Sequence, residues 1–295
     1  MRLEFIFAVD LFLTPTTEMA DIFLPATTWM EREEIGPEFF SLHISAGQRA
    51  IPPLGEAWDD NKIFIELAKL MRKRGLLPYD FVRWDSVEEF NDARVKGLGM
   101  TFEELKEVIR VPIPIKYKLY EREGFKTPTR KVELYSTLLE RFGYEPLPEY
   151  HELPEGPAST PDLLQSYPFI LISPRELHYF NSRGRQSRAL RKLSPEATAE
   201  IHREAAEKHD IKDGDWTSIE TRWGKCRQRA KVTENLPPNV VSASTYWWYP
   251  EEPGPLYGCH ESNIGLAIPD APPYDPIEGT PWLVGHLCQI RKASD

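Results

Sequence analysis

The sequence is poor in cysteine and lacks any long apolar run. Its three cysteines, Cys226, Cys259 and Cys288, are widely spaced in 295 residues and form no CxxC or Cys/His ligand pattern. We therefore expect no metal ligand set and no iron–sulfur cluster in this chain, and we expect reduced, buried thiols. No apolar stretch approaches the roughly 20 residues that a transmembrane helix requires, so no membrane span is predicted.

The sequence also lacks a surplus of basic residues and a secretory signal. The formal net charge is -10, which argues against non-specific nucleic-acid binding. The first residues lack the charged start and small-residue cleavage site of a signal peptide, and they instead predict a strand that begins almost at once. With 41% hydrophobic and 28% charged residues, the composition is that of an ordinary globular protein, which we expect to be cytoplasmic.

Against this acidic background, one short stretch is strongly basic. It follows the apolar run Phe169–Ile172, which predicts a buried strand, and a turn at Ser173-Pro174. Like charges at this density repel unless an anion lies among them, and arginine suits phosphate because its planar guanidinium donates two parallel hydrogen bonds. Two interpretations stay open: a solvated basic loop, or a strand-end loop that holds a large polyanionic ligand. The charged residues are Arg175, Glu176, Arg183, Arg185, Arg188, Arg191 and Lys192, interleaved with Asn181, Ser182, Gln186 and Ser187.

The N-terminal part of the chain predicts a portion of an open α/β sheet. Residues 3–9 and 22–24 are expected strands, and Thr14 is a candidate helix N-cap between them. Asp10 and Thr14 would then follow the carboxyl end of a strand, where such sheets bind ligands, but capping or turn formation explains them equally well. Helices are predicted over residues 61–74, 86–95 and 101–110, the last from a capping box that Thr101 forms with Glu104.

Prolines separate this part from the rest of the chain. Eight prolines between residues 112 and 161 interrupt regular structure, and among them we predict a short strand at 132–135 and a short helix at 136–142. The predicted division is residues 1–115 for the C-terminal part of an α/β domain, 116–165 for a proline-rich connector with a short hairpin, and 166–295 for a second domain.

The second domain is expected to be a small closed β-barrel. Short strands joined by tight turns, with one inserted helix, are typical of that architecture, so the predicted fold class is α+β or α/β, an open α/β domain followed by a barrel. The predicted strands are 169–172, 216–221, 225–232, 240–245 and 282–291, the helix is 196–209, and Asp213-Gly214 is a strong turn signal.

Four consecutive aromatic residues, 246–249 (YWWY), stand just after one of these strands. Side chains alternate in an extended segment, so two would pack inward and two would cover a partner surface or a ligand ring. Burial on both sides of the segment is an equally good interpretation. His260, in the polar turn-rich segment that follows, is expected to be structural.

Taken together, these blocks resemble the C-terminal portion of the molybdopterin-dependent oxidoreductases, the dimethyl-sulfoxide-reductase superfamily. Residues 10–25 (DLFLTPTTEMADIFLP) resemble a family element that usually has Ala where this chain has Glu18. Residues 125–136 (FKTPTRKVELYS) are similar to a family hairpin in which Gly usually occupies the place of Arg130. The remaining matched blocks are residues 175–182 (RELHYFNS), similar to the cofactor-binding loop; residues 199–227, a looser match in which Lys208-His209 departs from the pattern; and residues 246–251 (YWWYPE) with Ser262-Asn263.

The resemblance implies a cofactor and the residues that would hold it. Family members bind Mo or W between two molybdopterin guanine dinucleotides, and the resemblance makes the second domain a double-psi-like barrel that covers both of them. The metal and the organic cofactor would perform the chemistry, and the protein would supply binding and electrostatics. By this resemblance, Arg175, Arg183 or Arg185 would bind the pyrophosphate, and Tyr246 or Trp247 would stack on a ring. His178 would lie near the pterin or the metal. The edges of the base and the pterin would be read by Asn181, Ser182, Gln186 and Asn263, and the other cofactor-binding candidates in the matched blocks are Glu176, Ser262, Asp10 and Thr14.

The hypothesis that results is a cofactor-binding C-terminal part of a molybdenum or tungsten oxidoreductase, inactive alone, that completes an active site with an N-terminal part absent from this sequence. The family also suggests an iron–sulfur electron-transfer subunit as a partner, and a twin-arginine signal on the absent part would place the enzyme in the periplasm. The alternatives are a non-catalytic module that carries or inserts the cofactor, and part of a hydratase or transhydroxylase of the same family. No nucleophile–base set predicts an independent hydrolase or lyase.

Overall fold

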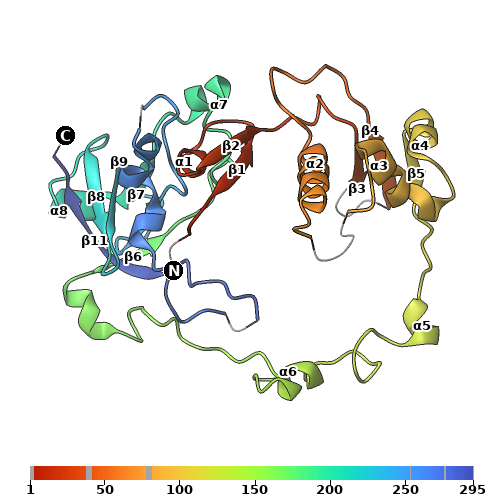
Figure 1. The fold of residues 1–295 in the computed structure, drawn as a ribbon. Coiled ribbons are helices and arrows are strands. Elements are labelled where there is room, and N and C mark those ends of the chain that lie inside the picture. The colour runs from red at the N-terminus through yellow and green to blue at the C-terminus, as the bar shows by residue number, and fades with distance from the viewer. Residues whose placement is uncertain (1–2, 38–41, 78–81, 253, 276, 295) are drawn as a thin grey trace. The chain divides into compact units, whose positions relative to one another are not determined.

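The computed structural model describes residues 3–37, 42–77, 82–252, 254–275 and 277–294 (Figure 1). Its contacts divide the chain into two compact units, which are described separately below. The first unit comprises Met1–Leu13 and Ala20–Glu149, and the second comprises Thr14–Met19 and Tyr150–Asp295.

The N-terminal segment is a small parallel α/β element. Strand β1 (Phe7–Asp10) pairs in parallel with β2 (Ile22–Pro25), and the one-turn helix α1 (Pro15–Glu18) lies between them in the chain. Parallel neighbours require a crossover of this kind, so the α/β prediction is confirmed, although the first strand is shorter than the predicted 3–9. The Thr14 side chain caps α1 in a reciprocal box with Thr17.

The rest of the first unit packs helices on a three-stranded antiparallel sheet. The sheet order is β3 (Glu34–Pro37), β4 (His43–Gly47) and β5 (Arg110–Pro112), none of which was predicted. The predicted helices are confirmed, and each has a side-chain N-cap, at Asp59, Ser86 and Thr101 respectively. These helices are α2 (Asp60–Lys73), α3 (Val87–Val95) and α4 (Phe102–Val108), and the buried core of the sheet consists of Ile35, Ala46, Val95, Phe102 and Leu105.

The connector that follows has local order but little core. Helix α6 (Thr137–Arg141) confirms the short helix, with Ser136 as its cap. The strand predicted at 132–135 is wrong, because this segment has no strand partner and its apolar side chains face solvent, Val132 being 63% and Leu134 85% exposed. The other short helices here are α5 (Leu119–Glu123) and η2 (Pro161–Gln165).

The second unit is built on a closed barrel (Figure 1, green to blue). Around the barrel the strand order is β10-β6-β11-β8-β9-β7, with parallel pairs β10–β6 and β9–β7 and antiparallel pairs elsewhere. The strands are β6 (Phe169–Ile172), β7 (Thr198–His202), β8 (Trp216–Glu220), β9 (Lys225–Thr233), β10 (Val240–Ala243) and β11 (His286–Lys292), and the barrel prediction is confirmed.

Two barrel elements differ from the predictions. The helix predicted at 196–209 is wrong in its first half, which is strand β7, and only α8 (Arg203–Lys208) is helical. The tertiary contacts explain the difference, because β7 fills the gap between β9 and β10 and buries Ala199 and Ile201 completely. The final strand begins at His286 rather than at residue 282.

The barrel core consists of the inward residues of each strand. On β9 the burial alternates, so Cys226, Gln228 and Ala230 face the interior while the intervening basic residues face outward. At the predicted turn, Gly214 has φ +83°, a conformation that favours glycine. Across the described residues, no helix combines the length and apolar character needed to cross a bilayer.

Candidate functional site

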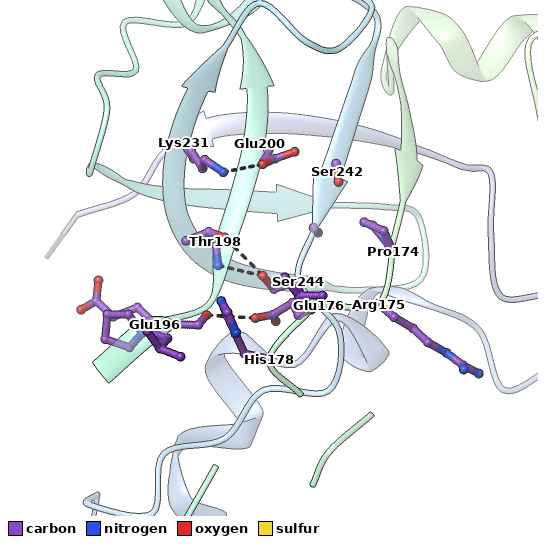
Figure 2. A pocket seen from close by; sticks show the side chains of 15 residues that line it. Pro174, Arg175, Glu176, His178, Glu196, Thr198, Glu200, Lys231, Ser242 and Ser244 are labelled. Carbon is purple, nitrogen blue, oxygen red and sulfur yellow. Dashed lines mark hydrogen bonds and ion pairs between the residues drawn. The ribbon is translucent and has the colours of Figure 1, made fainter. Parts of the chain in front are cut away.

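A cavity of about 530 Å³ lies against the outer face of the barrel, over strands β7, β9 and β10 (Figure 2). The register explains why segments distant in sequence meet there: Ile172 at the end of β6 pairs with Ser242 on β10, which pairs with Glu200 on β7. The loop after β6 therefore lies beside the end of β10 and the start of β7. The cavity is lined by Pro174, Arg175, Glu176, Leu177 and His178 of that loop, by residues 193–196, Thr198 and Glu200, and by Lys231, Ser242, Ala243 and Ser244.

Three arginines of the basic stretch, Arg175, Arg183 and Arg188, are exposed, and two of them meet at one aromatic ring, where they are free to bind an anion. Arg175 and Arg183 are exposed, and each guanidinium lies near the Phe180 ring, at 5.7 and 6.0 Å from its centroid. Within the described residues neither arginine makes an ion pair, and Figure 2 shows the Arg175 side chain extending away from Glu176. Of the two, only Arg175 lines the cavity.

Glu176 ties the loop to the aromatic segment. Its carboxylate accepts a hydrogen bond from the Ser194 hydroxyl at 3.0 Å and another from the indole N–H of Trp247. The Tyr179 hydroxyl donates to the Ser194 carbonyl at 2.6 Å, which fixes the same corner from the other side. The hydrogen bonds from Ser194 and Trp247 therefore hold the Glu176 carboxylate in the wall of the cavity.

Arg185 is an interior residue. Its side chain is 0% exposed, and its guanidinium lies 4.0 Å from the Tyr179 ring centroid and 4.6 Å from that of Trp247. Burial lowers the pKa of the guanidinium, and the Glu176 carboxylate 3.8 Å away opposes that shift. In this geometry Arg185 offers no surface to a ligand, and it organises the loop instead. Its hydrogen bonds run to the carbonyls of Asn181, Arg183 and Thr245.

The neutral residues of the loop are placed by their backbones. Asn181 has φ +55°, and its carbonyl accepts from Arg185 at 2.8 Å. The Ser182 carbonyl accepts from the indole N–H of Trp248 at 3.0 Å. The side chains of Asn181, Ser182 and Gln186 make no hydrogen bond within the described residues, so they remain available to a ligand.

The aromatic run packs on both sides rather than presenting two rings outward. Trp247 is completely buried and contacts Tyr179 edge-on at 5.4 Å, while Trp248 packs against Tyr257 at 5.7 Å. Tyr249 is also buried, and burial raises the pKa of its hydroxyl. Tyr246 alone is half-buried, so it is the only member of the run that keeps part of its surface for another molecule.

A buried glutamine that the sequence analysis missed links this site to the Ser262-Asn263 segment. Gln228 donates to the carbonyls of Ser244 and Ser262, each at 2.9 Å, and accepts from the Ser244 amide at 2.9 Å. Ser262 is itself buried and accepts from Tyr249, whereas the Asn263 side chain caps the turn that follows it. A polar residue in the inward phase of the β9 pattern was the signal that could have identified Gln228.

The structure brings together only some of the predicted residues. Arg175, Glu176 and His178 line the cavity (Figure 2). Asp10 belongs to the first unit, and Thr14 is occupied in capping α1. The analysis missed the opposite wall, where Lys231 pairs with Glu200 at 2.7 Å and Thr198 donates its amide to Ser244 at 3.1 Å. Among the described residues, no three His, Cys, Asp or Glu side chains lie close enough to hold a metal ion.

Comparison with known families gives two matches along the chain. Residues 169–285 match the molybdopterin dinucleotide-binding domain, and residues 1–70 match the molybdopterin oxidoreductase domain. The first of these ranges contains the whole cavity wall described above.

Individual relatives agree with these matches. Acetylene hydratase from Syntrophotalea acetylenica is 31% identical over 296 residues, which covers 97% of this chain and 40% of that protein. Dopamine dehydroxylase from Eggerthella lenta is 34% identical over 59% of this chain and 17% of its own length, and trimethylamine-N-oxide reductase from Haemophilus influenzae is 27% identical over 80% and 31%. The solved structure of acetylene hydratase from Pelobacter acetylenicus aligns with 98% of this chain and 40% of its own, with a TM-score of 0.87 and 30% identity. The chain thus spans less than half the length of these relatives.

Proposed function

The chain belongs to the molybdopterin oxidoreductases of the dimethyl-sulfoxide-reductase superfamily, and from that premise we propose that its barrel binds molybdopterin guanine dinucleotide with the loop after β6. The barrel is the family's dinucleotide-binding domain, and the family's cofactor carries Mo or W. The observation that carries the proposal is the pair Arg175 and Arg183, two exposed guanidinium groups that have no carboxylate partner within the described residues.

The residues present fit such a group. A diphosphate needs charged donors, and Arg175 and Arg183 provide them on one loop. A base or pterin edge needs neutral donors and acceptors, and the side chains of Asn181, Ser182 and Gln186 are free to supply them. The cavity of about 530 Å³ is in the size range of small-molecule sites.

Each part of the site then has a distinct task. Arg175 and Arg183 would hold the phosphates, and His178 would donate from the cavity wall to the cofactor. Arg185 would keep the loop in position, because its guanidinium bonds three carbonyls and is enclosed by two rings. The bound metal would supply the redox or Lewis-acid chemistry.

The remainder of the enzyme is also part of the proposal. Because the chain spans 40% of the length of acetylene hydratase, we propose that the active site is completed by the family's N-terminal part and that electrons, where the reaction needs them, pass through an iron–sulfur partner. The free thiols of Cys226, Cys259 and Cys288 favour a cytoplasmic location.

A second candidate reaction is the addition of water rather than electron transfer. It is favoured by the match to acetylene hydratase over 97% of this chain, since the relatives named for reductive reactions cover less of it. Acetaldehyde formation from acetylene by the assembled enzyme, with no electron acceptor present, would support hydration. Turnover that strictly requires an electron donor or acceptor would refute it.

Nucleotide binding by the chain is the direct test. We expect isothermal titration with guanosine 5′-diphosphate to show binding that weakens as salt rises, because phosphate contacts are charge-assisted. Arg175→Ala and Arg183→Ala should each weaken binding by about 10- to 100-fold, the value of one hydrogen bond to a charged group. Arg188→Ala is the matched control, since Arg188 is an exposed arginine of the same basic stretch that does not join Arg175 and Arg183 at the Phe180 ring.

Two results would overturn the assignment. One is wild-type affinity in the Arg175→Ala, Arg183→Ala double variant. The other is the absence of binding to the wild-type chain at millimolar nucleotide. Adenosine 5′-diphosphate in place of the guanosine compound reports whether the base is read.

A further inference from the structure

The first unit contains a cavity of its own, with a volume of about 540 Å³. All of its lining residues lie between Thr27 and Lys106, so the cavity is complete within that unit. Local pairing builds one side of it: Ala26 forms a parallel bridge with Trp58, and the Thr27 amide donates to the Trp58 carbonyl at 3.0 Å. Helices α2, α3 and α4 supply much of the remaining wall.

Two buried polar side chains in the lining of this cavity have no hydrogen-bond partner within the described residues. Asn91, on α3, is 1% exposed, and both the nitrogen and the oxygen of its side-chain amide are unpaired. Thr27 is also 1% exposed, and its hydroxyl is unpaired as well. Buried polar groups almost always have a partner, because leaving one unpaired is costly. Two such residues in one lining indicate that a bound molecule supplies the missing hydrogen bonds.

The chemistry of Asn91 specifies the group that would pair with it. Its amide presents an N–H donor beside a carbonyl acceptor, and another carboxamide satisfies both at once, since its own oxygen accepts while its own N–H donates. The Trp58 ring lines the same cavity and is 43% exposed, so it offers apolar aromatic surface to a flat ligand. The ammonium group of Lys62 lies 4.0 Å from the centroid of that ring.

The charges of the lining exclude an anion. The lining residues include seven carboxylates and four basic groups, a net charge of -3. Two of the basic groups already pair with carboxylates, Arg32 with Glu34 at 2.8 Å and Lys106 with Glu33 at 3.2 Å. The other two are outnumbered by the carboxylates, so a phosphate or carboxylate ligand would meet net repulsion.

We propose that this cavity binds a small uncharged aromatic carboxamide, whose amide pairs with Asn91 and whose ring packs on Trp58. The corresponding carboxylate is rejected for two reasons: it has no N–H to donate to the Asn91 oxygen, and its charge has the same sign as that of the lining. The proposal is independent of cofactor binding by the barrel, because the two cavities share no residue and belong to different units.

The test is isothermal titration of the 295-residue chain with nicotinamide and, separately, with nicotinic acid. Nicotinamide should bind saturably, and nicotinic acid at least tenfold more weakly. Asn91→Leu, which keeps the approximate volume and removes both polar atoms, should weaken nicotinamide binding by about 10- to 100-fold, the value of two hydrogen bonds. Asn61→Leu is the matched control, since Asn61 is a half-buried asparagine of the same unit that does not line the cavity.

Amide hydrogen exchange of Asn91→Leu distinguishes a ligand-binding asparagine from a structural one. Because the variant removes two unpaired buried atoms, peptides from residues 86–95 should exchange as slowly as in wild type or more slowly. Faster exchange would show that Asn91 stabilises the fold through a partner such as water, and it would overturn the proposal.

Three binding results would also overturn it: no saturable binding at millimolar nicotinamide, equal affinities for nicotinamide and nicotinic acid, or wild-type affinity in Asn91→Leu. Loss of nicotinamide binding with retained binding of guanosine 5′-diphosphate in Asn91→Leu supports it. If the wild-type chain binds nicotinamide but no nucleotide, the assignment of the barrel fails and that of this cavity stands.

Discussion

Replacing Arg185 by Met should open the loop after β6 while leaving the barrel folded. Met approximates the length of the apolar stem and removes only the charged head, so the substitution tests the guanidinium contacts rather than the volume. The loop is tied to the rest of the unit by three other contacts, at Glu176, Tyr179 and Trp248, which is why we expect it to loosen rather than detach.

The magnitude follows from the contacts of the guanidinium. Its hydrogen bonds reach the carbonyls of Asn181 at 2.8 Å and Thr245 at 2.9 Å, and each such bond to a charged donor contributes about 1.5–3 kcal/mol. Two enclosing rings add about 2 kcal/mol in a desolvated site. The desolvation of the charge offsets part of this sum, and removing one partner of a buried pair costs about 3–5 kcal/mol in practice. The opening equilibrium of the loop should therefore rise by about 10²- to 4 × 10³-fold.

Amide hydrogen exchange followed by mass spectrometry is the appropriate assay, because two units make a single global unfolding curve ambiguous. Peptides from residues 173–193 should exchange faster in Arg185→Met by that factor, while peptides from β8 and β9 stay protected. Arg183→Ala is the control: its side chain is exposed, so exchange should change little, although nucleotide binding should weaken. Unchanged exchange over 173–193 in Arg185→Met would refute the reasoning.

Two further predictions concern the barrel, and both are read from the urea midpoint of the barrel alone, followed by hydrogen exchange of the β8 and β9 peptides. Burial lowers the pKa of His286, whereas the ring in the unfolded chain protonates near pH 6.5. Stability of the barrel should therefore fall as the pH drops below about 6.5, and His286→Gln should flatten the profile of this midpoint against pH, whereas an unaltered profile would assign the effect elsewhere. A Cβ at Gly224 would lie 2.1 Å from the Leu266 carbonyl oxygen, so Gly224→Ala should destabilise the barrel by about 1–3 kcal/mol, and an unchanged midpoint would show that the turn shifts at no cost.

The parts of the fold that could be predicted are those where local pattern and tertiary environment agree. Phe169–Ile172 is apolar, bounded by a turn and central in the barrel, so its run of residues and its position give the same answer. Residues 196–202 show the opposite case, because their Ala and Glu content favours helix while the gap between β9 and β10 requires a strand. Ala199 and Ile201 are two residues apart and both are buried, as expected for a strand, in which every second side chain faces the same side. The Ala and Glu content of the segment concealed this pattern.

The candidate site also has a part that the sequence could predict and a part that it could not. Charge density singled out the loop that contains Arg175 and Arg183, but it could not separate an exposed arginine from a buried one. Arg185 lies in the same basic stretch as Arg183, and it is buried only because the rings of Tyr179 and Trp247 pack around it. The opposite wall was missed because Lys231 and Glu200 come together only through strand pairing.

The position of β11 has a consequence for biosynthesis. It is the last barrel strand in chain order, yet it lies between β6 and β8, and until it is inserted both of those strands present an unpaired edge. A newly made polypeptide would need shielding from association through those edges until the strand His286–Lys292 has left the ribosome. Loading of a nucleotide-bearing prosthetic group should accordingly follow barrel closure, so that maturation acts on the finished domain rather than on the emerging chain.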